Sequence, residues 1–109
     1  MKKIEVIFSP ERLERAKKVL YPLDIGGMVV SSVQGIGLQR GEEKLKQMKF
    51  FEFPKVKLEI IVNDKQVQKA IDLLVETIQT GKIGDGKIFV SDILNTVRIR
   101  TGEDGISAV

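Results

Sequence analysis

The sequence predicts an α+β fold, a ferredoxin-like βαββαβ sandwich with a long loop between its second and third strands. The first observation behind this prediction is the order of elements, which runs strand, helix, strand, loop, strand, helix, strand. The second is an internal repeat, since residues 5–20 resemble residues 59–74 in pattern. Such a chain places both helices on one face of an antiparallel sheet. A length of 109 residues fits one domain, taken as residues 1–109.

The first half of the chain supplies a strand, a helix and a second strand. Residues 3–8 alternate between polar and apolar side chains, as a half-buried strand does. Ser9 and Pro10 predict a helix start, with serine as the N-cap and proline at the first helical position. The apolar spacing within residues 13–20 continues that helix. Residues 28–33 are apolar and β-branched, which favours the second strand.

The second half repeats this order after a long interruption. Residues 35–54 follow neither a helical nor a strand period and are predicted as the long loop. Residues 56–62 alternate and predict the third strand. Asn63 begins a second amphipathic helix whose apolar stripe continues to Ile78, and Gly81 is predicted as its C-cap.

Two short strands and a tail complete the expected order. Residues 88–93 predict a fourth strand and residues 97–100 a short fifth strand. Residues 101–109 form a tail with few side chains to pack. Ile7 and Ile61 are predicted on the sheet face opposite the helices, where apolar side chains indicate burial in an oligomer.

The composition argues against several classes of function. The chain has no cysteine and no histidine, so disulfides and the commonest general base are absent. No apolar run approaches the roughly 18 residues that span a bilayer, so no membrane insertion is expected. Acidic and basic residues are interspersed around a formal charge of +3, which does not favour a nucleic-acid surface. These features favour a protein that is not an enzyme.

The segment from Thr80 to Ile88 carries the clearest chemical signal. Its three glycines allow backbone amides to turn toward one anion, and Lys82 and Lys87 add positive charge. The segment nearly matches the Walker A pattern, but Ile88 replaces the hydroxyl that would ligate magnesium, and the order of helix and strand is inverted. A phosphate-binding loop of another architecture is therefore predicted. The alternative is a simple helix-to-strand turn.

Two arginines near the end of the chain extend this prediction. In a strand, Arg98 and Arg100 would project from the same face. Paired guanidinium groups suit phosphate oxygens. A solvated basic face is the other reading of the same pair.

The sequence resembles the PII nitrogen-regulatory proteins. Residues 80–90, TGKIGDGKIFV, and residues 98–103 look like the C-terminal signature of that family. The resemblance covers almost the whole chain, and it includes residues 1–4, Gly27-Met28, the Gly-x-Gly-x-Gln-x-Gly pattern of residues 35–41, and residues 54–57.

The resemblance implies a cytoplasmic homotrimer in which ATP and ADP compete for clefts between subunits. The residues that it implies for the nucleotide phosphates are Gly84, Asp85, Gly86, Lys87, Arg98 and Arg100. The adenine end would be lined by Ile7, Val29, Glu59 and Ile61. The base of the family's T-loop, here about residues 37–54, would close the cleft through Gly35, Gly37 and Gln39, with Arg40 in the ligand-binding set where lysine is usual.

A second ligand is also implied by the resemblance. 2-Oxoglutarate would bind with Mg²⁺ when ATP is present, and the side-chain amide of Gln39 would supply an oxygen to the metal. Lys55 would pair with the distal carboxylate of the keto acid. Leu38 stands where family members often carry arginine, and the loop is shorter than in common bacterial members. Both departures weaken the expectation of keto-acid binding relative to that of ATP binding.

The T-loop is the implied output surface. Its tip, residues 42–53, would contact a regulated target, which could be an ammonium transporter, a metabolic enzyme or a nitrogenase system. No Ser, Thr or Tyr lies between Ser32 and Thr77, so covalent modification of a loop hydroxyl is chemically unavailable. The sequence leaves two alternative functions: a slow ATP-hydrolysing enzyme, and an RNA-binding ferredoxin-like module. The second needs aromatic side chains on the sheet face, and only Phe8 and Phe89 lie in the central strands.

Overall fold

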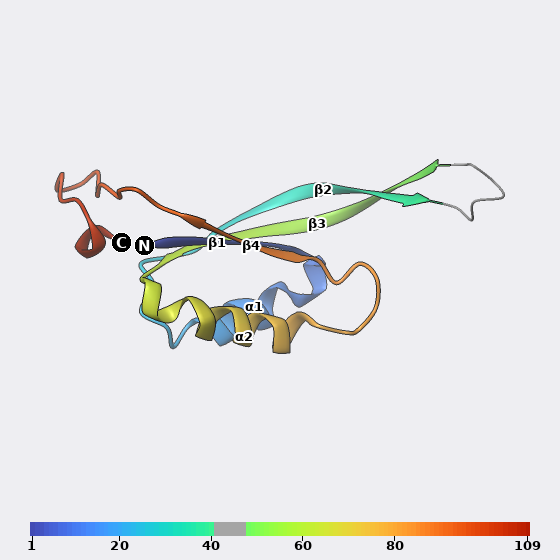
Figure 1. The fold of residues 1–109 in the computed structure, drawn as a ribbon, viewed down its shortest axis with the longest axis horizontal. Helices are drawn as coiled ribbons and strands as arrows, with labels where there is room; N and C mark the ends of the chain where they lie inside the picture. The colour runs from blue at the N-terminus through green and yellow to red at the C-terminus, as the bar shows by residue number, and fades with distance from the viewer. Residues whose placement is uncertain (41–47) are drawn as a thin grey trace.

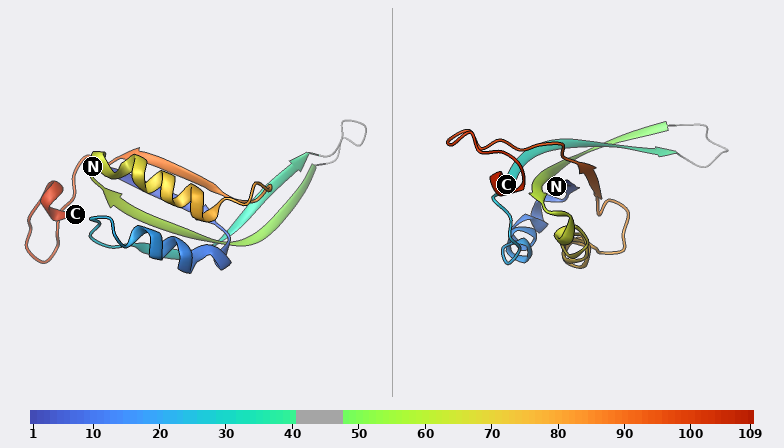
Figure 2. Two further views of the ribbon diagram at one scale, coloured as in Figure 1. Left: turned by 90° about the horizontal axis from the view of Figure 1, so that it is seen from below. Right: turned by 60° about the vertical axis from the view of Figure 1, so that its left-hand side comes forward.

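The computed structural model describes residues 1–40 and 48–109 and contains one antiparallel sheet with helices on one face. The sheet has four strands in the order β2-β3-β1-β4, so the chain crosses between its two halves as a ferredoxin-like fold does. Figure 1 shows α1 and α2 side by side beneath the sheet, and Figure 2 shows the same two layers from below and from the side. The elements are β1 (Lys2–Phe8), α1 (Leu13–Leu20), β2 (Val29–Arg40), β3 (Met48–Val62), α2 (Val67–Ile78) and β4 (Lys87–Asp92).

The core lies between the sheet and the two helices. The alternation predicted from the sequence sends every second side chain of β1 and β3 into it, because successive residues of a strand face opposite sides. Each fully buried Leu, Ile or Phe contributes about 1.5–3 kcal/mol by leaving water. The fully buried large side chains are Ile4, Val6, Phe8, Leu20, Leu58, Ile60, Val62 and Leu74.

The opposite sheet face carries a charge network among apolar side chains. Lys3 pairs with Glu59 at 2.8 Å, and Lys57 lies 3.5 Å from Glu59 and 3.8 Å from Glu5. The strand register places Ile61 beside Lys3 on this face. Ile7 and Ile61 therefore lie on the face opposite the helices, as the alternation predicts.

The long connection between the second and third strands is present, but its described ends are paired strands rather than loop. Gly35 pairs with Phe53 and Gln39 with Lys49, so β2 and β3 form a ribbon that projects beyond the sheet (Figure 1). The sequence shows no clear alternation here because the core does not cover the described side chains of the ribbon, of which Ile36 and Phe53 remain 63% and 50% exposed. The predicted tip at residues 42–53 falls partly outside the described residues, since residues 41–47 are not described.

The predicted fifth strand is absent from the described residues, and that prediction is wrong. Val97 forms a single bridge with Asp104, and the Arg98 carbonyl accepts hydrogen bonds from the amides of Thr101 and Gly102. These bonds close a turn at the point where a strand would continue. Arg98 and Arg100 consequently do not share a strand face.

The predicted helix boundaries are partly confirmed. The Asn63 side chain accepts a hydrogen bond from the Gln66 amide at 3.1 Å, as an N-cap does. Ser9 occupies the equivalent place before a short 3₁₀ turn, but its side chain makes no capping bond. Gly81 is not the C-cap of α2, because that helix already ends at Ile78 and Gln79 turns to an extended conformation.

Candidate functional site

The glycine-rich segment, residues 80–87, connects α2 to β4 at the end of the sheet from which the β2–β3 ribbon projects (Figure 1). We call it the phosphate loop, after its predicted role. Three strands meet it there: β1 ends at Phe8, β3 passes through Lys55, and β4 begins at Lys87. The phosphate loop therefore lies at the edge of the sheet where β1, β3 and β4 are neighbours.

Gly86 fixes the approach of the phosphate loop to β1. Its backbone has a φ of 109°, which disfavours residues with a side chain. A Cβ at this position would lie 2.0 Å from the Ile7 carbonyl oxygen. Glycine is thus required here, and it brings the loop backbone against Ile7.

Asp85 is bonded within the loop itself. Its carboxylate accepts hydrogen bonds from the backbone amides of Thr80 at 2.8 Å and Gly81 at 3.0 Å, and from the Thr80 hydroxyl. These bonds, that of the hydroxyl foremost, hold the pKa of the Asp85 carboxyl below its ordinary value. By contrast, the amides of Gly84 and Gly86 donate to no group in the described part of the chain.

Lys55 links β3 to the phosphate loop. Its ammonium donates to the Gly84 carbonyl at 2.8 Å and lies 3.5 Å from the Ser9 hydroxyl. Gly35 lies close to the same side chain, since a Cβ at Gly35 would come within 2.9 Å of Lys55 Cγ. The structure therefore brings Gly35, Lys55 and Gly84 together, as expected for one site.

The residues expected at the adenine end share the open sheet face. Val29 pairs with Glu59 and Glu59 with Glu5, and the next row places Ile7 beside Lys87. Ile61 lies in the row on the other side of Glu59, next to Lys3. Glu59 carries a lowered pKa, chiefly because Lys3 donates a hydrogen bond to it. Four expected residues, Ile7, Val29, Glu59 and Lys87, thus occupy neighbouring rows of one surface.

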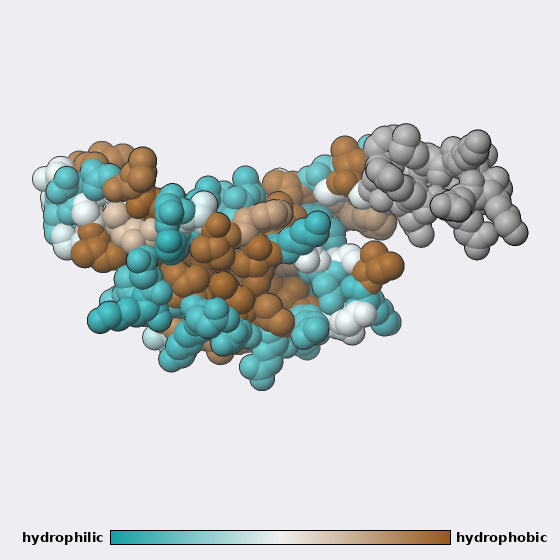
Figure 3. Space-filling view, viewed as in Figure 1, coloured by the Kyte–Doolittle hydropathy of each residue, from teal (hydrophilic) through white to brown (hydrophobic). Residues whose placement is uncertain are grey.

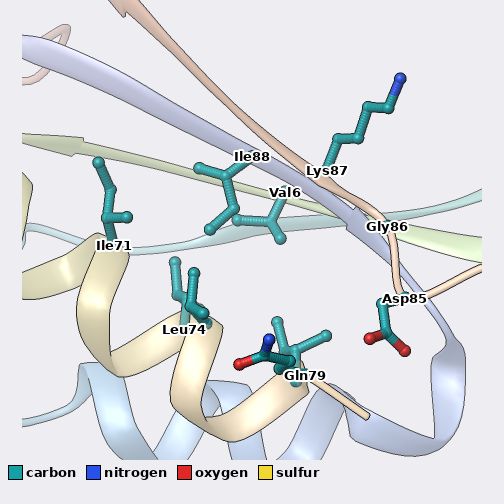
Figure 4. Close-up of a pocket in the computed structure, with 10 residues that line it drawn as sticks. Val6, Ile71, Leu74, Gln79, Asp85, Gly86, Lys87 and Ile88 are labelled. Carbon is teal, nitrogen blue, oxygen red and sulfur yellow. The ribbon is translucent and has the colours of Figure 1, made fainter. Parts of the chain in front are cut away.

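A cavity of about 340 Å³ lies on the other side of the loop, between α2 and β4. Its lining is mostly apolar, and Figure 3 shows apolar surface gathered between these two elements. In Figure 4 the Asp85 carboxylate lies beside this cavity, on the side of Gln79, whereas the Lys87 side chain extends away from the cavity. The cationic side chain of Lys87 is therefore turned away from the cavity, on the sheet face where the strand register places it beside Ile7.

The two arginines lie far from the phosphate loop within one subunit. The segment that follows β4 lies beside the N-terminus, at the opposite end of the molecule from the loop (Figure 1). Arg98 pairs with Glu103 at 3.0 Å and donates to the Ser107 carbonyl at 3.2 Å. Arg100 is exposed and has no ion-pair partner among the described residues. The expected grouping of these arginines with the loop does not occur inside a single chain.

The remaining expected residues lie on the projecting ribbon. Gly37 pairs with Phe51, and Gln39 and Arg40 are at the end of β2. The side chains of Gln39 and Arg40 fall outside the described part of the structure, so the expected metal contact of Gln39 stays a prediction. Within residues 1–40 and 48–109, no three His, Cys, Asp or Glu side chains gather into a metal-binding cluster.

Three contacts were not anticipated from the sequence. They are the Thr80 hydroxyl on Asp85, the Lys55 bond to the loop carbonyl, and the Glu103 pairing of Arg98. The spacing of Thr80 and Asp85 within one glycine-rich turn was the available signal for the first. The second depends on a strand that is distant in sequence and offers no such signal.

Comparison with known proteins supplies the family context. The family model described as "Nitrogen regulatory protein P-II" matches residues 1–103. A nitrogen regulatory protein P-II of Pasteurella multocida is 48% identical over the full length of both chains. Nitrogen regulatory protein P-II 1 of Escherichia coli K12 is 45% identical, also over the full length of both. These relatives are named as regulatory proteins, in agreement with the expectation of a protein that is not an enzyme.

Solved structures agree with the fold. The structure of B. subtilis GlnK superposes with a TM-score of 0.88 at 33% identity, over 99% of this chain and 97% of that one. A B. subtilis GlnK–ATP complex superposes with a TM-score of 0.87 at 34% identity, covering 99% and 94%. These neighbours confirm the predicted ferredoxin-like fold. No helix in the described ranges is both long and apolar enough to cross a bilayer.

Proposed function

Because the chain belongs to the nitrogen regulatory protein P-II family, we propose that it is a nitrogen-metabolism regulator that binds ATP and ADP at the phosphate loop. The observation that carries this proposal is a set of loop groups that make no bond within the described structure. The amides of Gly84 and Gly86 have no partner in the described structure, and Lys87 projects beside them. Unpaired amides and one cation are suited to phosphate oxygens. The fold shared with a GlnK–ATP complex supports the proposal.

The nucleotide site lies between subunits of a homotrimer in this proposal. Support comes from the distance between the loop and the arginines, which lie at opposite ends of one subunit (Figure 1). A head-to-tail contact would bring the end of one chain beside the loop of the next. Val29, one of the predicted adenine residues, and Phe89 are apolar and exposed on the same sheet face, and both would then be covered.

Magnesium and 2-oxoglutarate form the second part of the proposal. Lys55 already reaches the loop carbonyl of Gly84, so its ammonium lies where a carboxylate beside the nucleotide would need a cation. The Gln39 amide would supply an oxygen to Mg²⁺, which prefers oxygen ligands and keeps several of its own waters. When bound, the metal would supply positive charge for the anionic groups of the nucleotide and the keto acid.

The β2–β3 ribbon is the proposed output element. It projects beyond the sheet, and the segment of about residues 37–54 at its end would contact a regulated target in the cytoplasm, such as an ammonium transporter, a metabolic enzyme or a nitrogenase component. Since this segment has no hydroxyl side chain, ligand occupancy is the proposed input. The RNA-binding alternative loses support, because Phe8 is fully buried in the core and cannot stack on a base.

Titration calorimetry tests the proposal. We expect ATP and ADP to bind the wild-type protein, and 2-oxoglutarate to bind only when ATP and Mg²⁺ are present. Lys87→Ala should weaken ATP binding about tenfold, roughly the loss of one charge-assisted contact. Lys69→Ala is the control, since Lys69 is an exposed lysine of α2 on the helix side. Absence of ATP binding to the wild type at millimolar concentration would refute the proposal. Steady ATP turnover above roughly 1 s⁻¹ would instead indicate an enzyme.

A further inference from the structure

The phosphate loop divides into two halves that differ in how their amides are used. In the first half, the amides of Thr80 and Gly81 donate to the Asp85 carboxylate, and the Lys82 amide lies 3.3 Å from the Thr80 hydroxyl. In the second half, the amides of Gly84 and Gly86 have no hydrogen-bond acceptor among residues 1–40 and 48–109. Two amides of the first half therefore already bind an anion, which is the Asp85 carboxylate of the same chain.

The charged side chains of the loop also point in opposite directions. The Asp85 carboxylate lies on the helix side near the end of α2, while Lys87 extends to the other side of the sheet (Figure 4). A phosphate beside Lys87 would therefore be separated from the Asp85 charge by the loop backbone. An ionised carboxylate has no proton to donate to phosphate, so direct binding by this side chain would require a bridging cation.

A fixed loop binds its ligand better than a loop that must be ordered on binding, because the ordering cost is removed. Three contacts fix this one: Asp85 on the first amides, Lys55 on the Gly84 carbonyl, and Gly86 against Ile7. Of the three, only the Asp85 contact closes the loop on itself. The Thr80 hydroxyl completes it by donating to the same carboxylate.

We propose that Asp85 is a positioning residue, whose carboxylate closes the first half of the loop through Thr80 and Gly81 and thereby aims the open amides of Gly84 and Gly86 at the phosphates. This inference rests on the proposed nucleotide function. It also revises the role that the family resemblance implies for Asp85, from a group that holds phosphate to one that holds the loop. Thr80 acts as its partner rather than as a ligand.

The test combines nuclear magnetic resonance on the ligand-free protein with calorimetry of ATP. The amide-proton signals of Thr80 and Gly81 should shift together in one acid transition, because both amides donate to the carboxylate that is being protonated. Asp85→Asn should abolish this common transition and weaken ATP binding at least tenfold. Thr80→Val removes one of three bonds and should give a smaller loss. Glu76→Gln is the matched control, since it removes the same charge from an exposed site on α2.

Two outcomes would overturn the inference. Unchanged or tighter ATP binding by Asp85→Asn would show that the carboxylate is idle or repels the phosphates. Weaker binding without a carboxylate-linked shift of the Thr80 and Gly81 amides would show that Asp85 acts on the ligand directly. If the wild type fails to bind ATP, the nucleotide proposal fails, while the titration of the ligand-free protein still decides whether Asp85 closes the loop.

Discussion

At the scale of single residues, the site depends on where side chains are absent as much as on where they are present. Gly86 allows the loop backbone to pass within a few ångströms of the Ile7 carbonyl. That passage places Lys87 in register with Ile7 and starts β4. The glycine pattern alone indicated an anion site, but it could not show that Gly86 is required by a neighbouring strand. Only the fold reveals that contact.

Replacing Gly86 with alanine should destabilise the protein by about 2–4 kcal/mol, because the new Cβ meets backbone atoms and the positive φ adds strain. Gly102→Ala provides the control. Its φ of 71° is also positive, but a Cβ there meets nothing within 4 Å, so a loss of only about 1 kcal/mol is expected. Urea unfolding of both variants at one fixed protein concentration measures the difference. Equal losses of stability in the two variants would mean that the clash of the new Cβ with the Ile7 carbonyl does not destabilise the protein.

At the scale of elements, the sequence predicted what a buried core imposes. The strands at residues 3–8 and 56–62 were found because every second side chain enters the core, and α2 was found from its apolar stripe. The paired strand ends within residues 35–54 were not predicted, because the described side chains there, such as Ile36 and Phe53, lie outside the core. The strand expected at residues 97–100 failed for a related reason, since its alternation of charge and apolar residue belongs to a turn.

The residues of the candidate site were likewise predictable only in part. Residues close in sequence, such as those from Gly84 to Lys87, could be assigned together from their pattern. The family resemblance assigned Lys55 to the carboxylate of the keto acid. Its hydrogen bond to the Gly84 carbonyl could not be predicted, because it depends on how β3 passes the phosphate loop. The ion pair between Arg98 and Glu103 likewise depends on the turn that begins at Arg98, where the sequence predicted a strand instead. Periodicity reports burial, and it carries little information on contacts between surface groups.

The two helix starts offer a test of capping at this scale. Asn63→Ala removes the side-chain oxygen that accepts the Gln66 amide, and we expect it to lower the free energy of unfolding by about 1 kcal/mol. Ser9→Ala is the comparison, because Ser9 holds the same position without a capping bond. Its loss should be clearly smaller when both variants are unfolded in urea. A larger loss at Ser9 would show that its 3.5 Å approach to Lys55 matters more than capping.

At the scale of the whole molecule, one chain holds the residues of the proposed site but does not bring them together. The phosphate loop and the segment that follows β4 lie at opposite ends of the molecule (Figure 1). Lys87 at the loop and the exposed Arg100 in that segment are nevertheless both cations expected for one triphosphate. Much of the open sheet face, with its paired charges and exposed Val29 and Phe89, lies between them. The proposed cyclic assembly would resolve this separation, because each contact would then join the loop end of one subunit to the tail end of the next.

Mixing two defective proteins decides whether the site is shared. Lys87→Ala and Arg100→Ala should each bind ATP weakly as pure proteins. Unfolded together and refolded as a mixture, they should form some clefts in which the loop comes from an Arg100→Ala subunit and the arginine from a Lys87→Ala subunit. Random assembly restores both cations in about one cleft in four, so calorimetry should detect that fraction of sites with wild-type affinity. If both groups came from the same chain, every cleft would keep one defect, and no tight sites would appear at any mixing ratio.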